Sequence, residues 1–335
     1  TTKVLGTLMI QMNAGKNRLY QKLLREVFQL NLHPDKLGVT NIKKLNHALG
    51  NPAEALNNVI HIAGTNGKGS VAWKVCAGLR ASGLSTGLFV SPHISCFRER
   101  VQVNGSLISE SVVETHVPKI LSGCQSIGIQ ASYFEVATTL AFLHFAEQQV
   151  DAVVLECGLG GRRDATNIVR PALAIVTSIG LDHTRLLGDS VEKIAAEKAG
   201  IIKPNVPVLL GSRLPVDVFT EYAAKANSEV FHTKDFPRAP ELEDQITPDG
   251  LFDYDNENSH IAACALKVLQ QQSQAFSTID LDVASKAAAA TRPPCRFEQV
   301  TWRGEGGEVQ CVLDVGHNPD ALALLFHKVA AAYPG

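Results

Sequence analysis

The chain has 335 residues, of which 45% are hydrophobic and 19% charged, and its formal net charge is −2. This composition is typical of a folded globular protein and excludes a disordered chain, while the small net charge excludes a general attraction to nucleic acid. No apolar run approaches the ~20 residues that cross a bilayer, so we predict neither a nucleic-acid nor a membrane partner. The seven cysteines contain no C-x-x-C pair, which argues against a disulfide framework and a thiolate zinc site.

The predicted elements alternate between strand and helix from residue 58 onward. Before them, a helix over 16–30 carries an apolar stripe that begins at Leu19, and we expect it to pack on the main domain. The alternation indicates a mainly parallel sheet with helices on both faces. Residues 100–108 predict a hairpin that turns at Asn104–Gly105, and residues 232–256 predict a loop or linker. The predicted strands are 58–63, 86–90, 152–157, 172–178 and 207–210, and the predicted helices are 70–82, 110–121, 134–149, 191–199, 257–271 and 279–290.

A second domain is predicted to begin after Arg292-Pro293-Pro294, because such a stretch ends a helical segment. Beyond it, residues 297–302 and 309–314 predict strands and residues 319–332 an amphipathic helix, the opening of a Rossmann-like α/β domain. Roughly forty residues cannot bury a core of their own, so we expect the printed chain to end within this domain. The predicted division is therefore 1–292 and 293–335.

A glycine-rich loop lies between the first predicted strand and its helix. Its glycines let backbone amides close around phosphate oxygens, the helix N-terminus adds positive charge, and Lys68 is long enough to reach the terminal phosphates. Ser70 or Thr65 is a candidate hydroxyl near a magnesium ion. The spacing departs from G-x4-G-K-[ST], so a plain glycine-rich connection with a surface lysine is the alternative. The loop consists of Gly64, Thr65, Asn66, Gly67, Lys68, Gly69 and Ser70.

Polar residues also follow the other predicted strands. Ser91 comes after the second strand, Glu156 ends the third, and His183 comes after the fourth. Ligands bind beyond the carboxyl ends of parallel strands, so we expect these side chains to meet near the γ-phosphate of a nucleotide. Magnesium prefers hard oxygen ligands, which makes Glu156 the foremost candidate ligand. Taken singly, each of the three also fits a cap or a hydrogen-bonded loop residue.

Seven motifs resemble, in chain order, those of the folylpolyglutamate synthase and dihydrofolate synthase family of the Mur ligase superfamily. The resemblance implies an ATP-binding, P-loop-type central domain at 1–292 and the start of a C-terminal glutamate-ligase domain at 293–335. Only 63 residues precede Gly64, too few for the substrate-binding domain that cell-wall Mur ligases carry there. The motifs are GTNGKGS (64–70), SPH (91–93), RERVQVNG (98–105), LECGLGGRRDATN (155–167), SIGLDH (178–183), EKAGIIK (197–203) and DVGHNPDA (314–321).

The same resemblance implies roles for single residues. Lys68 and its loop bind the phosphates of ATP, and the ligands of one or two Mg²⁺ ions are Ser91, Glu156 and His183. Lys198 in the EKAG motif is expected to be carbamylated and to act in catalysis with Lys68 and His183; a bare surface lysine is the alternative that spacing alone favours. The residues implied to contact the nucleotide from the far side of the cleft are Asn258, Arg296, Asp314 and His317.

The implied reaction joins L-glutamate to a folate through an acyl phosphate, in a cytoplasmic monomer, or a mitochondrial one if a targeting segment was removed. Dihydropteroate is the alternative acceptor, either alone or together with folate in a bifunctional enzyme, and the residues assign no general base. The family's usual His-Gln pair is here Asp255-Asn256, a departure in the helix that carries Asn258. Two other classes stay open: a nucleotide-hydrolysing switch that shares only the phosphate loop, and a nucleotide-binding scaffold without turnover.

Overall fold

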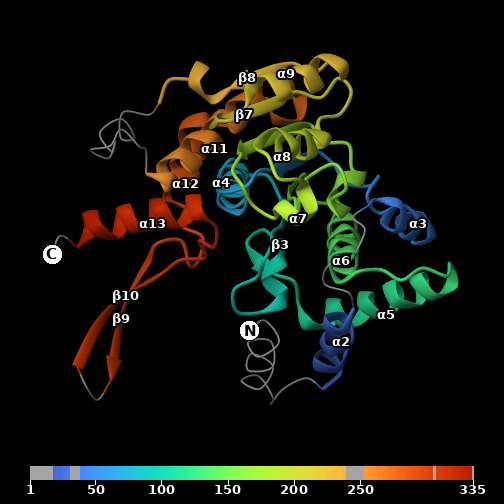
Figure 1. Ribbon diagram of the computed structural model, residues 1–335. Helices are drawn as coiled ribbons and strands as arrows, with labels where there is room; N and C mark the ends of the chain where they lie inside the picture. Colours follow the sequence, from blue (N-terminus) through green and yellow to red (C-terminus); the bar gives the residue numbers. More distant parts are fainter. Residues whose placement is uncertain (1–17, 31–37, 239–252, 305–306, 334–335) are drawn as a thin grey trace.

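An eight-stranded sheet forms the centre of the computed structural model, which describes residues 18–30, 38–238, 253–304 and 307–333 (Figure 1). The strand order is β4-β3-β2-β5-β1-β6-β7-β8, and all pairs from β2 to β8 are parallel. The predicted mainly parallel α/β fold is confirmed, with β3 and β4 as an antiparallel edge. The strands of this sheet are β1 Val59–Ala63, β2 Thr86–Phe89, β3 Val101–Val103, β4 Ser106–Leu107, β5 Ala152–Glu156, β6 Leu173–Ser178, β7 Val208–Arg213 and β8 Val230–His232.

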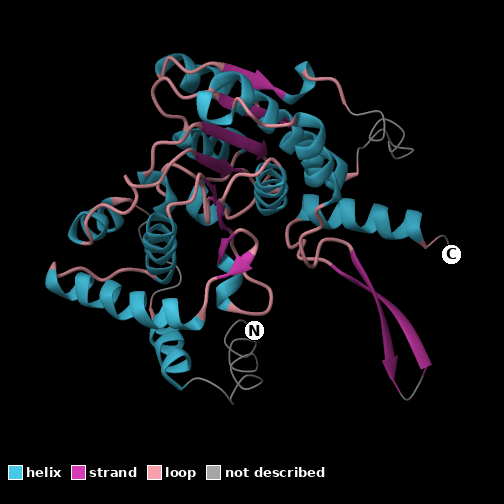
Figure 2. Cartoon of the chain, turned by 180° about the vertical axis from the view of Figure 1, so that it is seen from behind, coloured by secondary structure: helices cyan, strands magenta, loops and turns pink. Residues whose placement is uncertain are grey.

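Helices cover both faces of the sheet, as the view from behind shows (Figure 2). Strand β1 is buried at every position, so its sequence is a continuous apolar run around one histidine and not an alternating pattern. One face packs against α2, α3, α5, α6, α8 and α9, and the other against α4, α11 and α12. The helices are α2 Arg18–Gln29, α3 Thr40–Ala48, α4 Lys68–Ala81, α5 Glu110–Ser126, α6 Tyr133–Gln148, α7 Thr184–Leu187, α8 Val191–Lys198, α9 Val216–Lys225, α11 Tyr254–Gln272, α12 Leu281–Ala290 and α13 Pro319–Ala332.

Most predicted elements exist, and the differences have local causes. The predicted hairpin turn is present, because Asn104 (φ 52°) and Gly105 (φ 79°) both adopt the positive φ that a tight two-residue turn requires. Helix α4 begins at Lys68, two residues earlier than predicted, because Gly67 provides a left-handed N-cap. Leu19 was wrongly placed in the buried stripe of α2, since it is 50% exposed. Helices α3, α7 and α9 and strand β8 were not predicted.

The residues after 292 form a hairpin and a helix beside the main sheet. Strands β9 Glu298–Gly304 and β10 Gly307–Leu313 pair antiparallel with each other in a separate two-stranded sheet. Figure 1 shows this hairpin extending away from the main sheet, and Lys328 of α13 pairs with Asp253 at the start of α11 (2.5 Å). The predicted domain boundary at 292/293 stays a prediction. Of the predicted loop at 232–256, residues 239–252 lie outside the described part of the chain.

In the described part of the chain, no helix combines the length and the apolar character that a membrane span requires.

Candidate active site

Hydrogen bonds tie the phosphate loop to the end of β6 and to Gly180 just beyond it. The amide of Thr65 donates to the Ser178 carbonyl (2.7 Å), and the amide of Asn66 to the Ser178 hydroxyl (3.0 Å). The Thr177 hydroxyl donates to the carbonyl of Asn66 (2.6 Å), and the amide of Gly180 donates to the Thr65 hydroxyl (3.0 Å). These bonds fix the loop against the neighbouring strand, so that the first turn of α4 presents its free amides beyond the sheet edge.

Glu156 lies directly beside this loop. Its carboxylate, only 3% exposed, accepts a hydrogen bond from the amide of Ser91 (2.7 Å) at the end of β2. A Cβ on Gly69 would stand 3.2 Å from the Glu156 Oε2 atom, so the glycine permits this close approach. Burial raises the pKa of Glu156, and the charges of Lys68 and then Arg296 oppose that rise. A buried carboxylate in this setting is stabilised by a nearby cation.

Lys198 reaches the loop from the end of α8. It is 4% exposed, and its Nζ donates to the carbonyl of Gly64 (2.7 Å). Burial, together with the charge of Lys68, lowers the pKa of Lys198 to about 7. Lys68 itself donates to the carbonyl of Thr65 (3.0 Å). Two lysine side chains therefore approach the same loop, and one of them, Lys198, is buried and has a pKa far below the usual lysine value.

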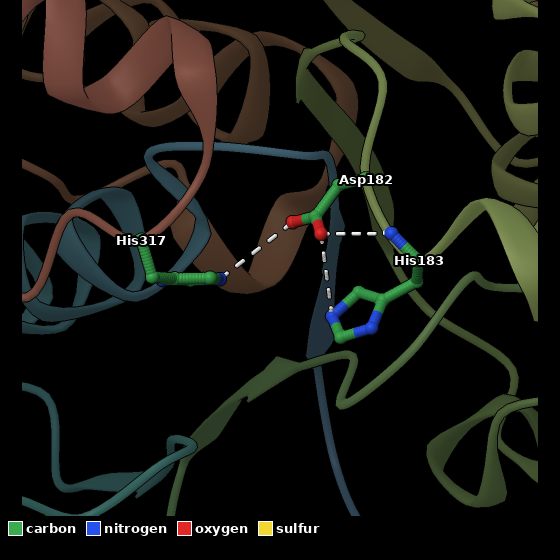
Figure 3. A group of neighbouring side chains, drawn as sticks. All are labelled: Asp182, His183 and His317. Atoms are coloured by element: carbon green, nitrogen blue, oxygen red, sulfur yellow. Dashed lines mark hydrogen bonds and ion pairs between the residues drawn. The ribbon is translucent and has the colours of Figure 1, made fainter.

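His183 stands at the N-cap of α7 with a left-handed backbone (φ 48°). Its amide donates to Asp182 Oδ1 (2.8 Å), and its ring Nε2 lies 3.7 Å from the same oxygen. From the other side, the Nε2 of His317 lies 3.6 Å from Asp182 Oδ2 (Figure 3). Burial and the charge of Lys68 lower the pKa of His183, although Asp182 opposes them. Asp182 is thus the centre of this group.

The far side of the site is built by α11 and by residues that follow 292. Asn258, 7% exposed, lies against Gly67, where an added Cβ would overlap its side-chain oxygen. Asp314 is held by the Tyr254 hydroxyl (3.0 Å) and the amide of Phe297 (2.8 Å), which both donate to its Oδ2. The residues following 292 therefore reach the same loop as the strand ends do.

All predicted site residues line one cavity of ≈1540 Å³. The structure thus brings together the groups that the sequence placed at separate strand ends. These residues are Gly64, Thr65, Asn66, Gly67, Lys68, Gly69, Ser70, Ser91, Glu156, His183, Lys198, Asn258, Arg296, Asp314 and His317.

Two residues of the site were missed from the sequence. Asp182 was named only as part of the SIGLDH motif (178–183). Asn318, 4% exposed, exchanges hydrogen bonds with Asn66 through both side-chain amides (2.9 and 3.2 Å) and donates to Asp182 (3.2 Å). A local signal existed, because an Asn before Pro319 is a typical N-cap, and Asn318 caps α13.

The residues present fit a nucleoside triphosphate with a divalent cation. The backbone φ is positive at Gly64 (155°) and Gly67 (84°), and at both positions a Cβ atom would collide with a neighbouring side chain. Lys68 supplies a flexible charge, and the buried Glu156 supplies the hard oxygen that Mg²⁺ prefers. The donor set therefore suits phosphate and magnesium.

Comparison with known proteins supports this interpretation. The Mur ligase middle domain family matches residues 62–234. The dihydrofolate synthase/folylpolyglutamate synthase of Bacillus subtilis is 43% identical over 185 residues, which cover 54% of this chain and 43% of that protein. The folylpolyglutamate synthase of Lacticaseibacillus casei is 32% identical over 308 residues, which cover 84% of this chain and 69% of that protein. A solved bifunctional folylpolyglutamate synthase/dihydrofolate synthase with Mn, AMPPNP and L-glutamate bound has a TM-score of 0.78 at 29% identity, covering 94% of this chain and 75% of that one.

The parallel sheet, the phosphate loop and the acidic strand end define a member of the Mur ligase superfamily. Within that superfamily, the chain belongs to the folylpolyglutamate synthase/dihydrofolate synthase family. The resemblance of the seven motifs is thereby confirmed.

Proposed function

We propose that the chain provides the ATP site of a ligase that joins L-glutamate to a folate through an acyl phosphate. The observation that carries the proposal is the convergence of Lys68, Glu156, His183 and Lys198 on one cavity. The aligned regions cover 43% and 69% of the lengths of the two relatives. The activity of the whole enzyme is therefore proposed for this chain and is not taken over from the relatives. Residues 1–292 act in this proposal as the ATP-binding domain, and 293–335 open the second domain.

The proposed roles follow from position. The amides of the loop and Lys68 hold the β- and γ-phosphates, and Ser91, Glu156 and His183 hold magnesium. The metal supplies neutralisation of phosphate charge when bound. Phosphoryl transfer to the acceptor carboxylate needs positioning and charge compensation more than a protein nucleophile, and Lys68 serves both. Asn258, Arg296, Asp314 and His317 hold the nucleotide from the opposite wall.

We further propose that Lys198 is carbamylated. Its Nζ is enclosed beside the Gly64 carbonyl, where an ammonium would repel the nearby metal ions. The neutral form of the Lys198 amine adds to the carbon of CO2 and releases one proton, and the resulting carbamate would place oxygen ligands where the ammonium stood. The modification predicts a carbamate carbon signal in NMR after incubation with ¹³C-bicarbonate, lost in Lys198→Ala.

The acceptor site is proposed for the part of the cavity away from the loop. There the lining includes Leu121, Ile129, Tyr133 and Phe134, a mixed apolar and aromatic wall suited to a flat heterocycle. The Arg100 guanidinium lies over the Tyr133 ring at 5.1 Å, which rigidifies this wall. Such a wall supports a pterin-bearing acceptor and has no function in a simple nucleotide switch. It fits folate and dihydropteroate alike.

The deciding experiment measures ADP release by the purified protein carrying its complete second domain, with tetrahydrofolate, dihydropteroate or no acceptor, each with and without L-glutamate. The proposal predicts glutamate-dependent release that Lys68→Ala and Glu156→Ala abolish, while Lys193→Ala, a surface change, leaves it intact. Hydrolysis that is independent of acceptor and glutamate would instead identify a switch. Nucleotide affinity without any turnover would identify a scaffold. The preferred acceptor separates folylpolyglutamate from dihydrofolate synthesis.

A further inference from the structure

The loop after β5 places one arginine on the wall of the cavity. Arg163 lines the cavity, and 43% of its side chain is exposed. Its backbone amide (3.2 Å) and its Nε (3.1 Å) both donate to Oε1 of Glu197, whose side chain is 9% exposed. Its Nη2 lies 3.4 Å from the carbonyl of Leu186, and its Nη1 has no hydrogen-bond partner among the described residues. The guanidinium is thus held along one edge, and donors on its outer edge remain available to a ligand.

The neighbours of Arg163 connect the proposed acceptor wall with the phosphate loop. On the acceptor side, the same loop brings Gly158 so close to Phe134 that an added Cβ would stand 2.4 Å from the ring. On the phosphate side, Glu197 immediately precedes Lys198, whose Nζ contacts the phosphate loop (2.7 Å). An acceptor that places its heterocycle on the aromatic wall and its reacting carboxylate at the phosphate loop therefore extends past this arginine.

Given the proposed ligase function, on which this inference rests, we propose that Arg163 binds the acceptor carboxylate that is not activated and thereby selects a folate over dihydropteroate. The glutamyl residue of a folate carries two carboxylates, of which one forms the acyl phosphate and the other stays free. Dihydropteroate carries a single carboxylate, which is itself activated and leaves no anion for Arg163. The planar guanidinium suits a free carboxylate, because two parallel N–H groups donate to its two oxygens.

Glu197 holds the guanidinium without using up its binding capacity. A single oxygen of Glu197 accepts both bonds, whereas a two-pronged arginine–carboxylate pair engages both oxygens and two guanidinium N–H groups. Because the side chain is already held, less of its rotational freedom is lost when a ligand binds. Arg163 contacts α7 and α8, which lie side by side (Figure 1), whereas the proposed nucleotide contacts come from α4, α11 and the residues after 292. The acceptor, and not the nucleotide, is therefore the ligand that this position fits.

The test replaces Arg163 by Met in the protein with its complete second domain. Calorimetry in the presence of Mg²⁺ and a non-hydrolysable ATP analogue measures the affinity for tetrahydrofolate and for dihydropteroate. We expect the dissociation constant of tetrahydrofolate to rise by about tenfold or more, which is about 1.4 kcal/mol, and that of dihydropteroate to stay within about twofold. Arg163→Lys keeps the charge but not the planar fork, so its affinity for tetrahydrofolate should lie between those of the wild type and Arg163→Met.

Steady-state turnover gives an independent readout. In Arg163→Met the KM for tetrahydrofolate should rise while kcat and the KM values for ATP and L-glutamate stay unchanged, because the subsite holds the acceptor equally before and during the reaction. The matched control is Arg185→Met, which removes the same charge from an exposed position on α7 outside the cavity lining. This control should keep every wild-type constant.

Unchanged affinity for tetrahydrofolate in Arg163→Met overturns the subsite, and so does an equal loss of affinity for both acceptors. A rise in the KM for L-glutamate alone would place the incoming amino acid at Arg163 and would also overturn it, as would a wild type that takes only dihydropteroate. Retained binding of dihydropteroate shows that the variant is folded. A wild type that binds neither acceptor contradicts the proposed function itself, whereas normal turnover of tetrahydrofolate by both the wild type and Arg163→Met contradicts only the subsite.

Discussion

Lys74 offers the sharpest test of how the nucleotide site is held together. Its side chain is 0% exposed within α4, the helix that begins with the phosphate loop, and its Nζ lies 3.0 Å from Asp255 Oδ1. It also donates to the carbonyls of Thr291 (2.8 Å) and Ala288 (3.4 Å) at the end of α12. Arg292, 58% exposed, contacts the other oxygen of Asp255 at 3.0 Å. A buried cation thus joins α4, α11 and α12.

Replacement of Lys74 by Met keeps most of the buried volume and removes the charge. Breaking a buried pair by removing one partner costs about 3–5 kcal/mol, and we expect the lower end, about 3 kcal/mol, because Asp255 retains Arg292. Asp255→Asn should cost as much or more, since it leaves the ammonium buried. The two effects should be less than additive in Lys74→Met/Asp255→Asn, because the residues share one interaction.

Urea unfolding followed by circular dichroism measures the loss as a lower midpoint at an unchanged m-value. The matched control is Lys193→Met, which breaks the solvent-exposed Lys193–Asp189 pair (2.8 Å) and should leave the midpoint where it is. A Lys74→Met protein within about 0.5 kcal/mol of the wild type would refute the reasoning, because that range is typical of surface changes.

Three further predictions concern other parts of the chain. Burial lowers the pKa of His61 from 6.5 to about 3, so the free energy of unfolding should fall as the pH drops from 6.5 towards 3. Unfolding curves recorded at a series of pH values should show a smaller fall in His61→Gln. Gly67→Ala should weaken binding of a fluorescent ATP analogue at least tenfold by displacing Asn258, whereas Gly83→Ala, equally left-handed (φ 86°) but in open space, should not. With Ellman's reagent, only the partly exposed thiols should react before unfolding, and fast reaction of more than these would contradict the burial of the rest. The partly exposed thiols are Cys96, Cys295 and Cys311, and the buried ones are Cys76, Cys124, Cys157 and Cys264.

The position of the site was predictable because it follows from a general property of parallel sheets. Glu156 and Ser91 lie 65 residues apart in the chain, yet they stand at the ends of the neighbouring strands β5 and β2. The amide of Ser91 donates a hydrogen bond to the carboxylate of Glu156. Buried apolar strands are recognisable without partners, so their carboxyl ends could be located. The meeting of the strand-end groups was a consequence of topology and not of local sequence.

The unpredicted features lack such local signals. Helix α9 fully buries only Phe219 and Ala223, which makes a short apolar stripe, and the three half-buried residues of β8 show no clear periodicity. The Asn66–Asn318 amide pair spans 252 residues and depends on where α13 is placed. No pattern in either segment specifies the other, which is why Asn318 was recognisable as a cap but not as a contact of the phosphate loop.

Lys74 gives a physical explanation for the aspartate at position 255, where this chain departs from the family pattern. The resemblance implies a histidine at this position, and the aspartate found here is largely buried, so that it needs a buried cation in addition to the exposed Arg292. Lys74 supplies that cation from α4, and Asn258 follows Asp255 by one turn of α11, against Gly67. The ion pair between Lys74 and Asp255 therefore holds Asn258 close to Gly67 of the phosphate loop. Position 255 therefore bears on the nucleotide site through the packing of α11 against α4.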